Sequence, residues 1–392
     1  MPLCNTAKRR VHPLLKRFLS SLITPDPLGS SPQILVLQLK RIGELILTAP
    51  ALHKLRETWP EARITLVTSM ACEALVPALP RVDEVLVFRE SFRQNKILFQ
   101  RLLTGTFDVC LDFTGTDRSA LFAMASRARR RVAFASAHKG WVRGLIYQNF
   151  VNVSTSATHV ADYYVELLRA IGLPSTGGEM QPALRVPPIA IQRARILLRE
   201  CGIADAFAVI HPGAREESHY WPAERWAEFI LHLQISHQMP CVLVGGAGVS
   251  EQNHLRDIRT ALAVLGAGPL PQPLVTLAGQ LDLMLLTALV ARARLIASCD
   301  NLLVQMGAAL TRPQIGLFGP TNPFAMRPRH SAARIISARH ASQPLSTFSP
   351  SEPGAPMAEI STQVVSVTAD ALLADGTTAP PIYSARQPDS RD

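Results

Sequence analysis

The sequence predicts an α/β protein with two doubly wound, Rossmann-like domains. Short apolar runs suited to strands alternate with longer segments of helical periodicity, and the alternation begins again after a Gly- and Pro-rich stretch near the middle of the chain. With 392 residues and 47% hydrophobic content, the chain can fill two domains of ordinary size. A cleft between the domains, beyond the carboxyl ends of the strands, is then the expected ligand site.

The first half contains the expected elements in order from residue 34. The apolar run 34–39 predicts a buried strand, Gly43 marks a tight turn, and the leucine spacing after Glu44 predicts a helix that ends near Trp59. Further strands are expected at 64–67, 84–88 and 109–113, and further helices at 92–103, 117–126 and 159–171.

The second half repeats this alternation after a break that runs from Pro174 to Pro188. Strands are expected at 208–210, 241–244, 274–277, 295–297 and 314–318, and helices at 223–233, 251–262, 281–291, 302–310 and 364–373. The predicted segments are a basic N-terminal extension (1–31), a first Rossmann-like domain (32–175), a linker (176–190), a second Rossmann-like domain (191–340), a loop with a closing helix (341–375) and a disordered tail (376–392).

Basic side chains are concentrated in the first half of the chain. Residues 1–180 hold 23 basic and 14 acidic side chains, whereas residues 181–392 hold 17 and 16. Such a field favours a polyanionic partner, for example membrane phosphate or a phosphorylated glycolipid, although a merely soluble basic surface stays open. Nucleic acid is not expected, because aromatic residues make up only 6% and no stacking motif accompanies the charge.

The cysteines and the apolar runs indicate a cytoplasmic chain. The six cysteines lack C-x-x-C spacing and do not cluster with histidines, so they indicate reduced thiols and neither a zinc site nor a disulfide framework. No apolar run reaches the roughly 18 to 20 residues that span a bilayer. The basic, leucine-containing first 23 residues form either an amphipathic helix at an anionic membrane surface or a disordered extension.

The first candidate site segment is Lys40-Arg41-Ile42-Gly43-Glu44, at the end of the first expected strand. A carboxylate at this place can act as a general base toward a hydroxyl group, while the two cations hold a phosphorylated acceptor. A glutamate in the first turn of a helix also favours the helix dipole, so both interpretations stay open.

Three more candidate segments follow strands of the second half. The stretch from His211-Pro-Gly-Ala-Arg215 to His219 offers backbone amides and an imidazole to a diphosphate. Gly245-Gly-Ala-Gly248, followed by Glu251, combines close backbone approach with an acid suited to ribose hydroxyls. Asp300-Asn301 ends a strand where a helix begins, which places amide dipoles beside the expected cleft. Each segment also has an ordinary interpretation as a loop or helix cap.

The order and spacing of these segments resemble glycosyltransferase family 9, the ADP-heptose:lipopolysaccharide heptosyltransferases. The resemblance begins with the basic loop, Gly43-Glu44 and Leu47-Thr-Ala-Pro-Ala-Leu52. It continues through 108–134, 159–173, 211–226 and 277–323, where Leu317-Phe-Gly-Pro-Thr-Asn-Pro323 is the most specific motif, and it covers roughly residues 33–375.

This resemblance implies a GT-B fold with an acceptor-binding first domain and a nucleotide-sugar-binding second domain. It implies transfer with inversion, without a metal ion or a cofactor, from ADP-heptose to an anionic glycolipid such as lipopolysaccharide core, at the cytoplasmic face of the inner membrane. By this resemblance Glu44 is the base, and Lys40 and Arg41 contact the acceptor, with Arg127, Arg129, Arg130 and Arg131 as further candidates. Donor contacts are expected from Gly213, Ala214, His219, Glu251, Asp300, Asn301, Gly319, Pro320 and Thr321.

At four positions this chain differs from the family's pattern. Glu44 stands where the family has Asp, and His219 stands near a common Lys. The segment 300–305 reads Asp-Asn-Leu-Leu-Val-Gln where the family reads Asp-Ser-Gly-x-x-His, so Leu302 and Gln305 replace Gly and His. Three functions stay open: a heptosyltransferase-like enzyme, a transferase with a different donor, and a non-catalytic glycolipid-binding or scaffold protein of the same fold.

Overall fold

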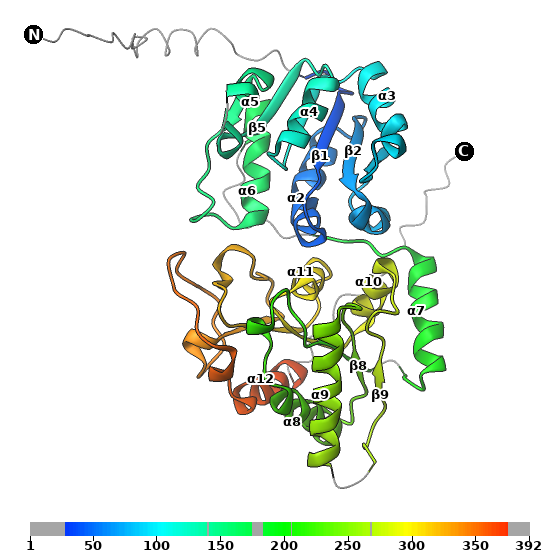
Figure 1. Cartoon of the computed structure of the whole chain (residues 1–392), viewed down its shortest axis with the longest axis vertical. Helices are drawn as coiled ribbons and strands as arrows, with labels where there is room; N and C mark the ends of the chain where they lie inside the picture. The colour runs from blue at the N-terminus through cyan, green and yellow to red at the C-terminus, as the bar shows by residue number, and fades with distance from the viewer. Residues whose placement is uncertain (1–27, 139–140, 175–182, 205, 267–268, 375–392) are drawn as a thin grey trace, which may run out of the picture.

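The computed structural model describes residues 28–138, 141–174, 183–204, 206–266 and 269–374. These residues form two α/β domains, one above the other in Figure 1, each built on a six-stranded parallel sheet. The predicted fold class is therefore confirmed. Most of the predicted N-terminal extension and the whole of the predicted tail lie outside the described residues.

The first sheet has the strand order β3-β2-β1-β4-β5-β6, and every neighbouring pair is parallel. Its strands are β1 (Gln33–Gln38), β2 (Arg63–Ser69), β3 (Glu84–Phe88), β4 (Val109–Asp112), β5 (Arg130–Phe134) and β6 (Asn149–Val151). Helices α2 (Ile42–Thr58) and α6 (Val160–Glu166) pack on one face, and α3 (Lys96–Thr104), α4 (Asp117–Ala125) and α5 (Trp141–Ile146) on the other. Because both faces are covered, the four central residues of β1 are all apolar.

The second sheet has the order β12-β11-β10-β7-β8-β9 and is also parallel throughout. Its strands are β7 (Ala208–His211), β8 (Cys241–Leu243), β9 (Leu274–Thr276), β10 (Leu295–Cys299), β11 (Gln314–Phe318) and β12 (Ala333–Ser337). Helices α8 (Ala223–Ser236), α9 (Val249–Leu265) and α12 (Thr362–Ala374) pack on one face, and α7 (Pro188–Glu200), α10 (Leu283–Arg292) and α11 (Leu302–Ala309) on the other.

Both sheets reverse their strand order at the same place. In the first sheet the chain continues outward in opposite directions from the neighbouring strands β1 and β4, and in the second sheet from β7 and β10. Such a switch point leaves a crevice at the carboxyl ends of the two strands, where ligands of doubly wound sheets bind. The candidate segments that begin at Lys40, His211 and Asp300 follow β1, β7 and β10.

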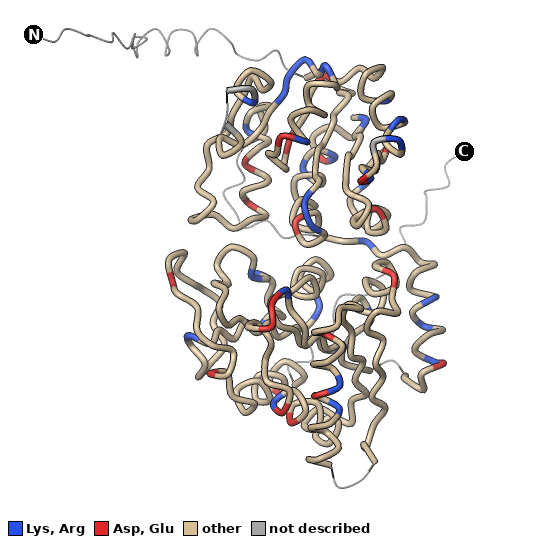
Figure 2. The backbone as a smooth tube through the Cα atoms, viewed as in Figure 1, with Lys and Arg blue, Asp and Glu red and all other residues tan. Residues whose placement is uncertain are grey.

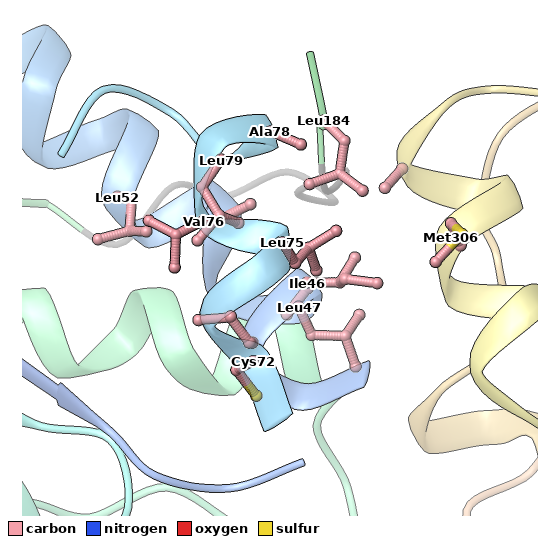
Figure 3. Packing of buried hydrophobic residues seen from close by; sticks show 14 of the residues in the cluster. Ile46, Leu47, Leu52, Cys72, Leu75, Val76, Ala78, Leu79, Leu184 and Met306 are labelled. Carbon is pink, nitrogen blue, oxygen red and sulfur yellow. The ribbon is translucent and has the colours of Figure 1, made fainter. Parts of the chain in front are cut away.

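One apolar cluster continues from the first domain into the second. Helix α2 contacts α11, and the 3₁₀ segment η1 (Met70–Ala78) contacts α10. Figure 3 shows Met306 of α11 across from Ile46 and Leu75, which belong to the same buried cluster. The chain that crosses between the domains joins this contact, since Leu184 N–H donates to the Ala309 carbonyl oxygen (3.0 Å) and Arg185 N–H to that of Ala78 (2.8 Å).

A second, polar contact joins the domains at the start of α6. The imidazole of His159 lies 2.9 Å, through Nε2, from the Arg327 carbonyl oxygen, and its Nδ1 accepts the Ala161 N–H at 3.2 Å. That second bond requires the proton on Nε2, so Nε2–H is the donor to Arg327. Arg329 forms a bidentate ion pair with Asp162 at 2.6 and 2.9 Å. The carboxyl ends of the two sheets therefore face each other.

The arginine cluster 127–131, a further candidate for acceptor contact, lies away from the carboxyl ends of the strands. Arg130 and Arg131 begin strand β5, beside the first residues of β4, so the cluster lies at the amino ends of the strands. Figure 2 shows this basic stretch at the edge of the first domain that faces away from the second. Arg131 donates to the carbonyl oxygens of Ile146 and Ala128, and Arg129 lies 3.6 Å from Asp108, which gives the cluster a structural role.

Helix α7 begins at Pro188, inside the stretch 176–190 predicted as linker, because proline is well suited to the first helical position. The remaining domain limits stay predictions. In the part of the chain that the structure describes, no helix combines the length and apolar character needed to cross a membrane.

Candidate active site

Glu44 lies in the first turn of α2, at the carboxyl end of β1. Its Oε2 accepts the Arg41 N–H at 3.3 Å, and its Oε1 lies 3.6 Å from Lys40 Nζ. The carboxylate side chain keeps 28% of its surface exposed. Glu44 thus lies in the first turn of the helix, where it favours the helix dipole and caps the Arg41 N–H, and it is also accessible to a hydroxyl group.

Lys40 is held by a side chain that sequence reasoning missed. Lys40 Nζ donates to Tyr164 Oη at 3.3 Å and lies 5.3 Å from the centre of the Tyr164 ring. Burial, and next the charge of Glu44, raise the pKa of Tyr164 well above its usual value, so the phenol stays protonated. Tyr164 comes from α6, and no sequence spacing connects it with the loop after β1.

The loop after β4 is fixed beside the loop after β1. Buried Asp112 accepts the N–H groups of Thr114 (2.8 Å) and Gly115 (3.0 Å), and the Tyr147 hydroxyl at 2.5 Å. Burial raises the pKa of Asp112, although these hydrogen bonds oppose the shift. Thr114 Oγ1 in turn accepts the N–H of Leu39 at 2.8 Å. A polar residue at the end of an apolar strand was the available signal for Asp112.

In the second domain, Asn301 joins the loops after β7 and β10. Its Oδ1 accepts the Leu303 N–H (2.8 Å) and caps α11, while its Nδ2 donates to the Gly213 carbonyl oxygen at 2.7 Å. Ser298 Oγ adds a hydrogen bond to Oδ1 at 2.7 Å. The side chain of Asn301 is therefore engaged within the protein, its carbonyl oxygen accepts the Val304 N–H at 3.3 Å, and the predicted donor contact of Asn301 stays a prediction.

Asp300 lies beside Thr321 at the start of α11. Thr321 Oγ1 donates to Asp300 Oδ2 at 2.8 Å, so the loops after β10 and β11 meet here. Burial raises the pKa of Asp300, while the Thr321 hydrogen bond and the nearby His219 imidazole oppose the shift. The structure thus brings together three of the predicted donor-site residues.

Glu251 folds back over the glycines with which it was predicted to act. Its Oε2 accepts the Gly246 N–H and lies 3.6 Å from His211 Nε2, and His211 is the main cause that keeps the pKa of Glu251 below its usual value. A Cβ atom on Gly213 would lie 2.8 Å from Glu251 Cγ, and one on Gly245 would lie 2.8 Å from Oε2. The glycines therefore make room for this carboxylate.

Gly319 and Pro320 pack against a later part of the chain. A Cβ on Gly319 would collide with Met357, and one on Gly354 would collide with the Pro320 carbonyl group. The Ala355 N–H donates to the Gly319 carbonyl oxygen at 3.0 Å. This close packing explains both glycines, and the predicted donor contacts of Gly319, Pro320 and buried Ala214 stay predictions.

The two halves of the site meet where α2 faces α11. A Cβ on Gly43 would lie 3.6 Å from Gln305 Cγ, and Gln305 Nε2 donates to the Met326 carbonyl oxygen at 2.6 Å. Gly43 immediately precedes Glu44, and Gln305 lies one turn after Asn301. Glu44, a carboxylate able to accept a proton, thus lies at the boundary of the first domain. On the other side of this boundary the second domain presents the N-terminus of α11, which suits a phosphate group.

Two facing Rossmann-like domains with their switch points toward each other define the GT-B class of proteins. The model of glycosyltransferase family 9 (heptosyltransferase) matches residues 96–352, and the chain belongs to this family.

Several relatives are similar to the chain over most of its length. Lipopolysaccharide heptosyltransferase 3 of Escherichia coli is 22% identical over 296 residues, covering 73% of this chain and 83% of that protein. Lipooligosaccharide heptosyltransferase 2 of Haemophilus ducreyi is 22% identical over 326 residues, covering 78% and 88%.

Solved structures show the same fold. A glycosyl transferase family 9 protein from Veillonella parvula superposes with a TM-score of 0.73 at 20% identity, covering 88% of this chain and all of that one. The E. coli ADP-heptose LPS heptosyltransferase II gives 0.70 at 22% identity, with coverage of 88% and 99%. An E. coli heptosyltransferase solved with ADP-2-deoxy-2-fluoro heptose gives 0.65 at 17% identity, with coverage of 86% and 99%.

Proposed function

We propose that this protein transfers heptose from ADP-heptose to a lipopolysaccharide core or related glycolipid, with inversion and without a metal ion or cofactor in the transfer step. The observation that carries the proposal is the position of Glu44. Its partly exposed carboxylate is held by Lys40 at the carboxyl edge of the first sheet, and its helix α2 contacts α11 of the second domain. Family membership and the names of the relatives support the donor and the acceptor.

In the proposed reaction Glu44 accepts the proton of an acceptor hydroxyl group. That oxygen forms a bond to the anomeric carbon of heptose as the bond from this carbon to the diphosphate oxygen breaks, and ADP leaves with the electron pair. Attack from the side opposite ADP inverts the anomeric centre. Lys40 and Arg41 attract the anionic acceptor and orient it toward Glu44.

The second domain holds the nucleotide sugar in this proposal. Backbone amides at the start of α11 and beside Gly213 and Ala214 face the diphosphate, His219 donates to it, and Glu251 binds the ribose hydroxyls. The Asp300–Thr321 hydrogen bond fixes the edge of the donor site formed with Gly319 and Pro320. The basic surplus of residues 1–180 fits an anionic glycolipid acceptor at the cytoplasmic face of the inner membrane.

A second candidate, a glycolipid-binding protein without transferase activity, is favoured by two contacts. Gln305 stands where the family has His and is engaged by the Met326 carbonyl oxygen, and Glu251 is turned toward its own loop. Neither contact alters Glu44 and Lys40, so this candidate retains acceptor binding and lacks turnover.

The test is a transfer assay of the Glu44→Gln variant, with ADP-heptose as the donor and lipopolysaccharide core as the acceptor. Removing the base is expected to lower kcat by at least about 100-fold, because general base catalysis supplies that much or more. The matched control is Glu57→Gln on the same helix, whose exposed side chain lies 3.9 Å from His53 and which is expected to keep wild-type kcat. Unchanged turnover in a folded Glu44→Gln protein would contradict the assignment, and wild-type protein that binds core without turnover would favour the second candidate.

A further inference from the structure

We propose that His232, His237 and Asp370 form a binding site for a divalent transition-metal ion, with Zn²⁺ as the best fit, that joins helices α8 and α12. The site goes beyond the proposed function. It lies at the end of α8 that precedes β8, at the amino ends of the second sheet and on the side of this domain away from the first (Figure 1).

The three side chains converge from two helices. His232 lies in the last part of α8, His237 caps its end, and Asp370 lies in α12. Asp370 Oδ1 is 2.7 Å from His232 Nε2 and 2.6 Å from His237 Nε2, and one ligand atom from each residue lies within 4.8 Å of the other two. Two imidazole nitrogens and a carboxylate oxygen form a donor set that suits Zn²⁺.

The spacing requires only a small adjustment to admit the ion. Zn²⁺ binds such atoms at about 2.0–2.2 Å in tetrahedral geometry, which separates neighbouring ligand atoms by about 3.3 Å. The two separations between Asp370 Oδ1 and the histidine nitrogens are below that value, so each of these two must open by about 0.7 Å. All three side chains are partly exposed, which leaves the fourth position to water.

The surroundings of the cluster also favour a cation. The site lies at the carboxyl end of α8, a 14-residue helix whose dipole and last carbonyl groups attract positive charge. Ser236 Oγ lies 3.5 Å from His232 Nδ1, the nitrogen left over when Nε2 binds metal, and such contacts orient histidine ligands.

Hydrogen bonds outside the proposed site already hold the segments of α8 and α12 together. Trp221 Nε1 donates to the Ile360 carbonyl oxygen at 2.9 Å, and Thr362 donates to Glu228, so α8 and α12 run side by side from their first turns. The proposed site lies farther along both helices, where Asp370 already contacts His232 and His237. The ion would therefore stabilise the docking of the closing helix and take no part in glycosyl transfer.

The test is binding of Zn²⁺ and Co²⁺ to the full chain, freed of any purification tag and dialysed against chelator. Calorimetry is expected to give one Zn²⁺ per chain, and Co²⁺ is expected to give the visible absorption of nitrogen and oxygen ligation. Asp370→Asn and His237→Gln, chosen to preserve side-chain size, are expected to weaken the affinity by at least about 10-fold, the lower limit seen even for residues behind the ligands.

The matched control is His340→Ala, which removes a histidine from the His340–Glu352 pair. Among the residues that the structure describes, this pair belongs to no group of three ligands, so the variant should keep wild-type affinity. The unfolding temperature of each variant is compared with and without Zn²⁺, so a loss of stability from the substitution itself does not enter. A wild-type chain that binds no Zn²⁺ at micromolar concentration, or variants that bind it as tightly as wild type, would overturn the proposal.

Discussion

Thr114 and Asn301 hold the two switch points in the same way. Each follows the fourth strand of its sheet and hydrogen-bonds the backbone of the loop after the first strand, at Leu39 and at Gly213. The sequence indicated Asn301 because it adjoins an acid at a strand end. Thr114 was missed because a single threonine after a strand has many ordinary roles, and only the pairing of β1 with β4 brings it beside Leu39.

Protonation of His159 is expected to weaken the protein. Burial, followed by the charge of Arg329, lowers the pKa of His159 to about 4, against about 6.5 in the unfolded chain. The unfolded state therefore binds more protons between these values. Stability is complete above about pH 6.5 and falls as the pH drops toward 4, by up to about 3 kcal/mol from this residue.

His159→Gln tests this account through urea unfolding between pH 4 and 7.5. Glutamine retains an N–H donor for the Arg327 carbonyl oxygen but cannot be protonated. Between pH 6.5 and 4 the free energy of unfolding should therefore fall less in this variant than in wild type, by up to about 3 kcal/mol. His330, whose pKa burial and Arg334 lower to about 4, keeps its own part of the slope. The control is His53→Gln, at an exposed position on α2. An unchanged slope in His159→Gln would exclude His159 as its source.

At the scale of elements, the motif Leu317–Pro323 serves to dock a later loop. Asn322 Nδ2 donates to carbonyl oxygens of Ser349 and Glu352 at 2.8 and 3.0 Å, and Gly354 lies against Pro320. The strongest family signal in the sequence thus has a packing explanation beside its proposed place at the donor site. The two roles are compatible because the packing fixes the loop that carries Thr321.

Gly354→Ala is expected to destabilise the protein by about 1–3 kcal/mol, because the new methyl group would overlap the Pro320 carbonyl, which is backbone and has little room to move. The measurement is thermal or urea unfolding. Gly29→Ala, where an added Cβ would meet no atom within 4 Å, should leave stability within about 0.5 kcal/mol. Equal stability of the two variants would show that the loop relaxes freely.

The strands that the sequence predicted differ in composition from the strands that it missed. Strands such as β1 and β10 contain apolar runs because helices cover both faces of the sheet. Strand β5 begins with two arginines and β6 begins with Asn149, so neither shows such a run. The arginines of β5 lie at its amino end, where the guanidinium group of Arg131 donates to the carbonyl oxygens of Ile146 and Ala128.

At the scale of the molecule, the doubled alternation predicted two domains, but it did not predict how they meet. The contact depends on Met306, Ile46 and Leu75, which are core residues by pattern and lie between the domains only because α2 and α11 face each other. The same contact places Gln305 beside Gly43. The first half of the site was therefore predictable from the loop after β1, whereas its relation to the second half required the structure.

The central claim is that a nucleotide sugar binds at the β7–β10 switch point for transfer to an acceptor near Glu44. The most direct measurement is calorimetric titration of the full chain with ADP-heptose, repeated with Asp300→Ala, which removes the carboxylate beside Thr321. Saturable binding at one site per chain, weakened at least about 10-fold in Asp300→Ala by loss of the loop contact, is the predicted result. No binding of ADP-heptose or of any other nucleotide sugar to the folded wild-type protein would contradict it.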